Sequence, residues 1–448
     1  MPQPLDTLTA ALLDAARKAG AEAADAIAVD GTSLSIDVLK GKLEQAERSE
    51  GVDIGLRVLI GKRQACVSAS DTRPETMAEM AERAVAMARE APEDPCIGLA
   101  DPAQLARGWD AAALELDDPA PEPSPAELQD FAARAEAAAL AVPGISQVQS
   151  ASAAYGRRAL HLAASNGFSG GYARSDSVIS CVAITGEGTA MERDYNSEMR
   201  IFAGDLPGPE EIGRIAGERA AARAGARRPR TGAYPVVFDE RISSSLIGHL
   251  LAAINGSAIV RGASWLRDAA GEQVLPGHLS LIEDPHRPRA AGSRPFDAEG
   301  LPTARRAIVA DGALTGWVLD LATARKLGLE STGNAARGTS APPSPSVGNV
   351  TLTPGERTRD DLLAEMGTGL LVTSMIGSTI NPNTGDYSRG ASGFWVENGR
   401  ITHPVNECTI AGNLRDMLKT IVPANDARPH LSRRVPSLLV EGLTLAGD

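Results

Sequence analysis

Side chains that could do chemistry are concentrated in one polar segment near the end of the sequence, residues 378–390. It offers amides, hydroxyls, one carboxylate and one guanidinium, and Ile380 is its only branched aliphatic residue. Such a segment could hold a peptide backbone through hydrogen bonds, because loops often carry binding groups. It could equally be a turn-rich connection, since Asn-Pro and Thr-Gly-Asp satisfy turn geometry by themselves. The candidate peptide-binding residues are Asn381, Asp386, Tyr387, Ser388 and Arg389.

The histidines show no spacing typical of a metal site. They are His161, His249, His278, His286, His403 and His430. None is followed by Glu and no two are three to five residues apart, unlike the paired histidines of zinc peptidases. The closest mixed cluster is His403, Glu407 and Cys408, but Pro404 disfavours a helix, and on a strand His403 and Cys408 would point to opposite faces. We interpret this segment as a structural strand rather than a metal site.

Motifs for nucleophiles and nucleotides are also incomplete. Residues 390–394 end in Phe where a nucleophile elbow needs Gly. No lysine has Ser three residues before it, which argues against a Ser-x-x-Lys hydrolase. The Gly186-Glu187-Gly188 segment lacks the third Gly of a dinucleotide fingerprint. Cys408 could be a thiol nucleophile, but no base can be assigned to it, so a buried and inert thiol is the simpler interpretation.

Composition limits the classes of partner. The chain has 448 residues, with 44 Lys or Arg against 57 Asp or Glu, so its formal net charge is −13. Phosphate contacts need a basic surface and base stacking needs aromatics, which make up 3% here, so we expect no nucleic-acid partner. The sequence contains no run of about 18 apolar residues, so it predicts no membrane span. The N-terminal residues lack a signal-peptide pattern and the cysteines are widely spaced, which favours the cytoplasm and reduced thiols.

Apolar periodicity predicts an α/β region in the first half of the chain. Helices are expected at residues 5–19, 74–90, 125–142 and 209–226. Strand-like stretches lie at residues 26–29, 34–38, 52–58, 159–163, 178–184 and 198–202. Ser124 and Glu127 predict a capping box at the start of the third helix. On the second helix, Met77, Met80 and Met87 are interpreted as core residues on one apolar stripe.

The second half has the pattern of a mainly β domain. Short apolar runs are separated by Gly, Pro, Asn and Ser, and one helix is expected at residues 243–255. Residues 331–346 are predicted to form an exposed, mobile loop. The predicted fold class is therefore α+β, with an N-terminal α/β region followed by a mainly β C-terminal domain. The expected domains are residues 1–95, 120–228 and 233–448, the last lining a cleft between subunits.

Several motifs together resemble those of a known family. They are NPNTGDYSRG at residues 381–390, GFWVENG at 393–399, TIAGNL at 409–414, RPFD at 294–297, KLG at 326–328 and Ser-Asn-Gly at 165–167. This set resembles the TldD/PmbA family, and more narrowly its PmbA (TldE) branch, over nearly the whole chain. The peptidase branch of that family binds zinc through a His-Glu-x-x-x-His helix and a later Cys.

The resemblance implies that this chain lacks those ligands. The corresponding helix runs through residues 246–252, where Ile247, Gly248 and Ala252 stand in place of the first His, the Glu and the second His. No Cys follows Asn413. We therefore expect no catalytic residue, no metal and no cofactor in this chain, with zinc in a paralogous partner. His249 is expected to be a helix residue with a satisfied hydrogen bond.

The resemblance also implies a function. The expected role is a non-catalytic partner subunit of a cytoplasmic TldD/PmbA-type zinc metallopeptidase that acts on small or unfolded polypeptides. The expected partners are a zinc-bearing TldD-type paralogue, a second copy when the chain is alone, and a peptide substrate. Two alternatives stay open. One is an independent hydrolase with an unrecognised site, such as residues 386–389 or Cys408, and the other is a peptide-binding homodimer without catalysis.

Overall fold

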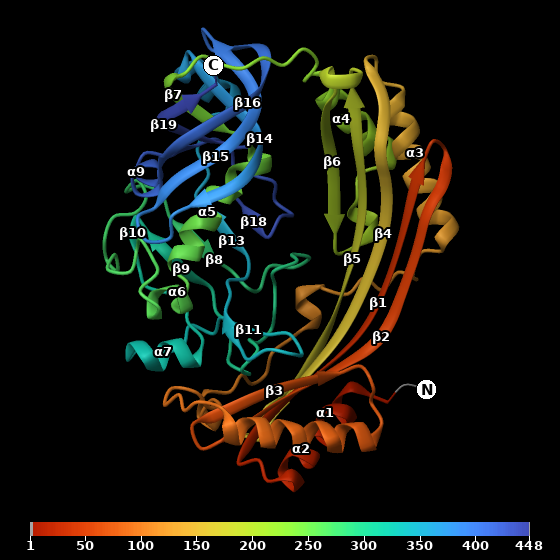
Figure 1. The fold of residues 1–448 in the computed structure, drawn as a ribbon, viewed down its shortest axis with the longest axis vertical. Helices are drawn as coiled ribbons and strands as arrows, with labels where there is room; N and C mark the ends of the chain where they lie inside the picture. The colour runs from red at the N-terminus through yellow and green to blue at the C-terminus, as the bar shows by residue number, and fades with distance from the viewer. Residues whose placement is uncertain (1–2, 448) are drawn as a thin grey trace.

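The computed structural model describes residues 3–447 and has two parts that lie side by side, a long curved sheet and a C-terminal β domain (Figure 1). The strands of the long sheet run in the order β3-β2-β1-β4-β5-β6, and all neighbours are antiparallel. They are β1 (Ala23–Leu39), β2 (Lys42–Ile60), β3 (Arg63–Ala69), β4 (Ile145–Ala164), β5 (Ser169–Thr185) and β6 (Glu192–Arg200). Residues 1–95 and 120–228, which were predicted as two domains, therefore contribute strands to one sheet.

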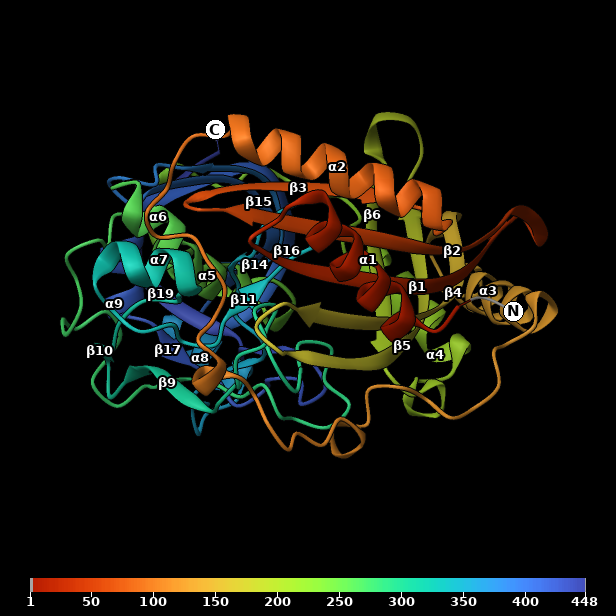
Figure 2. The same cartoon turned by 90° about the horizontal axis from the view of Figure 1, so that it is seen from below.

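Helices cover one face of the long sheet in two separate pairs. They are α1 (Leu5–Ala19), α2 (Pro74–Glu90), α3 (Pro125–Leu140) and α4 (Pro209–Ala221). Figure 1 shows α1 and α2 together at the lower end of the sheet, and Figure 2, seen from that end, shows α3 and α4 to one side of them. The capping box of Ser124 and Glu127 at the start of α3 is confirmed. Met87 of α2, in contrast, is 48% exposed and does not belong to the core that contains Met77 and Met80.

The arrangement of the helix pairs explains why short strands were predicted where long strands exist. Even-numbered residues of 24–28 pack beneath α1 and α2, and even-numbered residues of 34–38 pack beneath α3 and α4. The alternation therefore keeps its period of two along all of β1. Residues 30–33 lie between the two pairs and are not buried, so nothing requires them to be apolar. The predicted strands at 26–29 and 34–38 are two parts of β1.

The C-terminal domain is built around a sheet that closes on itself. Its order is β16-β15-β14-β7-β19-β17, and β16 also pairs with β19. The strands are β7 (Gly232–Phe238), β14 (Gly369–Ile380), β15 (Asp386–Glu397), β16 (Arg400–Asn413), β17 (Val422–Pro423) and β19 (Leu438–Ala446). The predicted helix is confirmed as α5 (Glu240–Ala253), and its Leu246, Ile247 and Leu250 are fully buried in the core of this domain.

A second, smaller sheet and short helices complete this domain. The order of that sheet is β10-β9-β8-β13-β18. The remaining elements are α6 (Gly256–Val260), α7 (Leu321–Leu327), α8 (Arg359–Met366), α9 (Leu414–Lys419), β8 (Leu281–Glu283), β9 (Arg306–Ala310), β10 (Ala313–Leu314), β11 (Ala335–Ala336), β12 (Ser344–Pro345), β13 (Val350–Leu352) and β18 (Arg433–Arg434). The α+β class is confirmed, whereas the limits of the domains at 1–95, 120–228 and 233–448 stay a prediction. No helix of residues 3–447 is both long and apolar enough to cross a membrane.

The prediction of residues 331–346 as an exposed loop is wrong for residues 333–335, which are buried, whereas residues 340–342 are exposed as predicted. This segment contains the paired strands β11 and β12, and it packs against the long sheet. The side chain of Arg337 is completely buried and binds Asp25 of β1. A Cβ on Gly55 of β2 would lie 2.2 Å from the carbonyl oxygen of Thr339, so the two backbones are in direct contact. Polar residues of this segment such as Arg337 and Thr339 are not solvated loop residues, because their contacts, Asp25 and Gly55, lie in the long sheet across the boundary between the two parts of the molecule.

Candidate functional site

The predicted peptide-binding residues lie together where β14 turns into β15. Asn381 donates its backbone N–H to the carbonyl of Asp386, and Gly385 donates to the carbonyl of Asn381, both at 2.9 Å. Side chains along β15 then alternate between its two faces. Tyr387 is buried, and Arg389 shares its face, whereas Asp386 is exposed on the other face. The structure therefore brings the candidates into one hairpin but divides them between two surfaces.

Asp386 fixes the turn and does not bind Arg389. Its carboxylate accepts from the hydroxyl of Thr384 at 2.6 Å and from Nδ2 of Asn413 at 3.0 Å. These two hydrogen bonds hold the pKa of Asp386 below its usual value. Arg389 instead donates from Nε to the carbonyl of Gly377 at 2.7 Å, across the hairpin. Both charged groups therefore have structural partners, and whether they also bind a peptide stays a prediction.

Behind the hairpin, Tyr387 packs against the helix α5. Its hydroxyl donates to the sulfur of Met375 at 3.2 Å, and its ring lies edge-on to that of His249, with 5.9 Å between centroids. Burial raises the pKa of Tyr387 to about 12. Burial and the nearby charge of Arg389 lower the pKa of His249, which favours the neutral imidazole. The expected hydrogen bond of His249 is not seen at Nε2, which is buried without a partner among the described residues.

The face of α5 that corresponds to the zinc helix is filled by other groups. Ile247 is fully buried in the core. A Cβ on Gly248 would lie 3.0 Å from Nη1 of Arg433, so a guanidinium stands beside the position where the resemblance implies the peptidase glutamate. A cation in that place opposes the binding of a second cation. In the part of the chain that the structure describes, no group of three or more His, Cys, Asp or Glu could hold a metal ion. The residues present do not fit zinc.

The cluster considered near His403 is not brought together. His403 lies on β16 and its Nδ1 is 2.9 Å from the hydroxyl of Thr402. Glu407 binds the guanidinium of Arg228 at 2.5 Å. Cys408 donates from Sγ to the carbonyl of Ala391 at 3.2 Å, and burial raises its pKa to about 11. The thiol is therefore protonated near neutral pH and is a poor nucleophile.

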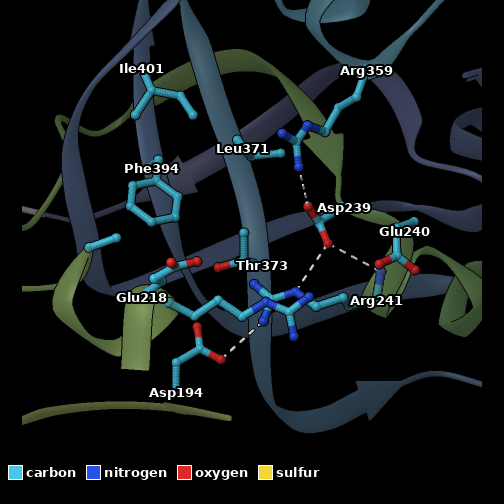
Figure 3. A pocket seen from close by; sticks show the side chains of 12 residues that line it. Asp194, Glu218, Asp239, Glu240, Arg241, Arg359, Leu371, Thr373, Phe394 and Ile401 are labelled. Atoms are coloured by element: carbon cyan, nitrogen blue, oxygen red, sulfur yellow. Dashed lines mark hydrogen bonds and ion pairs between the residues drawn. The ribbon is translucent and has the colours of Figure 1, made fainter. Parts of the chain in front are cut away.

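Sequence reasoning missed a cavity of about 290 Å³ between the two parts of the molecule, which we call the interface cavity (Figure 3). One wall is formed by α4 and β6 of the long sheet, and the other by the start of α5 and the strands β14–β16. Asp239 binds Arg241 at 3.2 Å and Arg359 at 3.0 Å, and Asp194 binds Arg241 at 3.0 Å. Its lining residues extend from 194 to 401, so no local spacing could indicate them.

Comparison with known proteins identifies the family. Models of the PmbA/TldA metallopeptidase match in chain order, with domain 1 at residues 24–88, the central domain at 118–224 and the C-terminal domain at 231–447. The Metalloprotease PmbA of Escherichia coli O157:H7 is 38% identical over 93% of this chain and 90% of its own length. The chain belongs to the PmbA/TldD family. The Metalloprotease PmbA homolog of Haemophilus influenzae is 35% identical over 97% of this chain and 94% of its own.

Solved structures agree with this assignment. A Bacteroides thetaiotaomicron protein described as a candidate modulator of DNA gyrase has a TM-score of 0.91 at 28% identity, covering 99% of this chain and 98% of its own. The fold is also shared with TldE of Thermococcus kodakarensis, with a TM-score of 0.86 at 21% identity, covering 98% of this chain and 100% of its own. The resemblance seen in the sequence is confirmed at the level of the PmbA family, and a protease-family role is supported.

Arg389 provides a test of the hairpin as a peptide-binding site. If its guanidinium clamps a peptide, Arg389→Ala should reduce peptide cleavage by the chain and its paralogue together at least about tenfold. Loss of the bond to Gly377 should cost only about 0.5–1.5 kcal/mol of stability, so the melting temperature should change little. Arg400→Ala, at the other end of the β15–β16 pair, is the control. A marked fall in melting temperature would indicate a structural role, and no change in either measurement would make the site assignment wrong.

Proposed function

We propose that this chain is the non-catalytic partner subunit of a TldD-type zinc metallopeptidase that acts on small or unfolded polypeptides in the cytoplasm. The observation that carries the proposal is the position of Arg433 beside Gly248. In the peptidase branch, the resemblance places the general-base glutamate, which activates the zinc-bound water, at this point of the helix. Here the position is Gly248, and the guanidinium of Arg433 lies beside it. No side chain at this point can therefore act as the base for a zinc-bound water.

The relatives support a pairing of two paralogues. Haemophilus influenzae contains a Metalloprotease PmbA homolog, and it also contains a Metalloprotease TldD homolog that is 28% identical to this chain over 39% of the chain and 36% of its own length. Two related proteins in one organism are the expected arrangement if one carries the metal and the other completes the peptide cleft. We propose a zinc-bearing TldD-type paralogue as partner and a homodimer when this chain is alone.

The β14–β15 hairpin supplies a surface for this role. The side chain of Ile376 is 77% exposed, next to the carbonyl of Gly377 that Arg389 holds. An apolar side chain beside strand edges fits an extended peptide or a second subunit, because peptides often add as a strand with side chains in shallow pockets. In this arrangement the chain shapes and lines the cleft, and the paralogue cleaves.

The decisive experiment compares the chain alone, the paralogue alone and the two together on an unfolded protein such as reduced casein. We expect the chain alone to cleave nothing and to retain no stoichiometric zinc after dialysis, and the mixture to cleave. About one zinc per chain, lost on His249→Ala, would contradict the proposal. Cleavage by the chain alone would favour an independent hydrolase. Peptide binding without any effect on the paralogue would favour a non-catalytic homodimer.

A further inference from the structure

We propose that the interface cavity is a binding site for the carboxylate of a small acyl amino acid or peptide C-terminus with an apolar side chain. The cavity includes the first residues of α5 and parts of β14 and β15, but its lining contains none of the residues 381–389 of the hairpin turn and not His249. It uses groups from both parts of the molecule, α4 and β6 on one side and the C-terminal domain on the other (Figure 3). The inference does not depend on the proposed function, because binding can be measured on this chain alone.

Arg219 of α4 is the first element of the argument. It lines the cavity and is not exposed on the surface, yet no described carboxylate lies within ion-pair distance of it. Nη1 donates to the carbonyl of Tyr195 at 3.1 Å and to Oδ1 of Asn196 at 2.9 Å, which fixes the guanidinium. Nε and Nη2 form the side-on edge and have no acceptor among the described residues. This edge is the one that receives a carboxylate in a bidentate pair.

The charges around Arg219 act in both directions. Burial and the charge of Arg241 lower the pKa of Arg219, whereas the charges of Asp194, Asp239 and Glu240 raise it. The side chain of Arg241 is only 9% exposed and is held between Asp194 and Asp239, while its Nη2 has no acceptor among the described residues. A carboxylate bound at the free edge of Arg219 would supply the direct ion pair that this guanidinium lacks.

Each acidic residue of the cavity forms its ion pair with an arginine other than Arg219. Asp194 binds Arg223 at 2.7 Å in addition to Arg241, and Asp239 binds both Arg241 and Arg359. The two glutamates have separate partners. Glu218 binds Arg214 at 2.7 Å and Glu240 binds Arg428 at 2.8 Å. Among the ionised groups that line the described cavity, Arg219 is therefore the one without a direct ion pair.

Three apolar side chains also line the cavity and set the second half of the specificity. Phe394, Leu371 and Ile401 line the same cavity, and Figure 3 shows them on the side away from Asp194 and Arg241. Ile401 is 47% exposed, so contact with a ligand would remove apolar surface from water. A volume of about 290 Å³ lies at the lower end of ligand pockets. It suits one terminal residue rather than a long peptide.

The test measures binding by calorimetry, using the purified full chain and N-acetyl-leucine. We expect one molecule to bind per chain, and we expect N-acetyl-leucinamide, which lacks the carboxylate, to bind at least about tenfold more weakly. Free leucine tests whether the natural source is an amino acid or a peptide terminus, since its ammonium would meet no unpaired acid. Free leucine is expected to bind more weakly than the acetylated form.

The variants assign the effect to the cavity. Arg219→Gln should weaken binding of N-acetyl-leucine at least about tenfold, because it removes a charged fork, and Arg134→Gln on α3 should leave binding unchanged. Arg134 is an exposed arginine paired with Glu210 and lies outside the cavity. If Arg219→Gln folds poorly, Arg219→Lys keeps the charge and loses the fork. The proposal is overturned if wild-type protein binds no N-acetyl-leucine, if acid and amide bind equally, or if a folded Arg219 variant binds normally.

Discussion

Replacement of Asp25 by Asn is expected to lower the free energy of unfolding by about 3–5 kcal/mol. Asp25 of β1 accepts from Nε of Arg57, its cross-strand neighbour on β2, at 2.6 Å, and it also binds Arg337 from the β11–β12 segment. All three side chains are at most 5% exposed. Burial lowers the pKa of both guanidiniums, which shows how much solvation they have lost. Asn would leave the buried guanidiniums of Arg57 and Arg337 without the carboxylate that binds both of them.

The effect can be read from the shift of the urea midpoint at constant slope. Asp53→Asn is the matched control, because Asp53 is an exposed aspartate of the same sheet whose carboxylate accepts from Ser70 at 2.6 Å. It should change stability by no more than about 0.5 kcal/mol. The double variant Asp25→Asn with Arg337→Met should recover part of the loss, since it removes one of the unpaired cations. Equal losses for the single Asp25 and Asp53 variants would show that the buried triad contributes little.

A second large loss is expected for Gly393→Ala. Gly393 of β15 pairs with Val372 of β14, and a Cβ there would lie 1.9 Å from the carbonyl oxygen of Leu371. No side-chain rotation can relieve a contact between Cβ and backbone, so the two strands must separate. We expect a loss of about 3 kcal/mol or more, or protein that does not accumulate in soluble form.

The control for this change is another strand glycine, Gly51 of β2. A Cβ at this position would meet no atom within 4 Å. Gly51→Ala should therefore be neutral or slightly stabilising, because it reduces the freedom of the unfolded chain. If Gly393→Ala were also neutral, the close approach of β14 and β15 in this structure would be wrong.

Gly393 also shows where local motif reading fails and where it succeeds. The Gly390–Phe394 segment lies within β15, in agreement with its rejection as a nucleophile elbow. The reason that it needs glycine is a contact with β14, which comes from a different part of the chain. Periodicity, in contrast, located α1, α2, α3, α4 and α5 well, because helix boundaries depend on nearby residues such as the capping pair Ser124 and Glu127.

The sequence by itself determined the family, the fold class and the position of most helices and apolar strands, because those depend on local spacing and on motifs that are contiguous in the chain. It did not determine the length of β1, the burial of Arg337 or the interface cavity. β1 is continuous because two separate helix pairs cover it, and Arg337 is buried because Asp25 lies across the boundary between the two parts. The cavity joins Arg219 to Phe394 from elements far apart in the chain. Only the tertiary structure decides which charges are left without a partner, since pairing depends on distance in space.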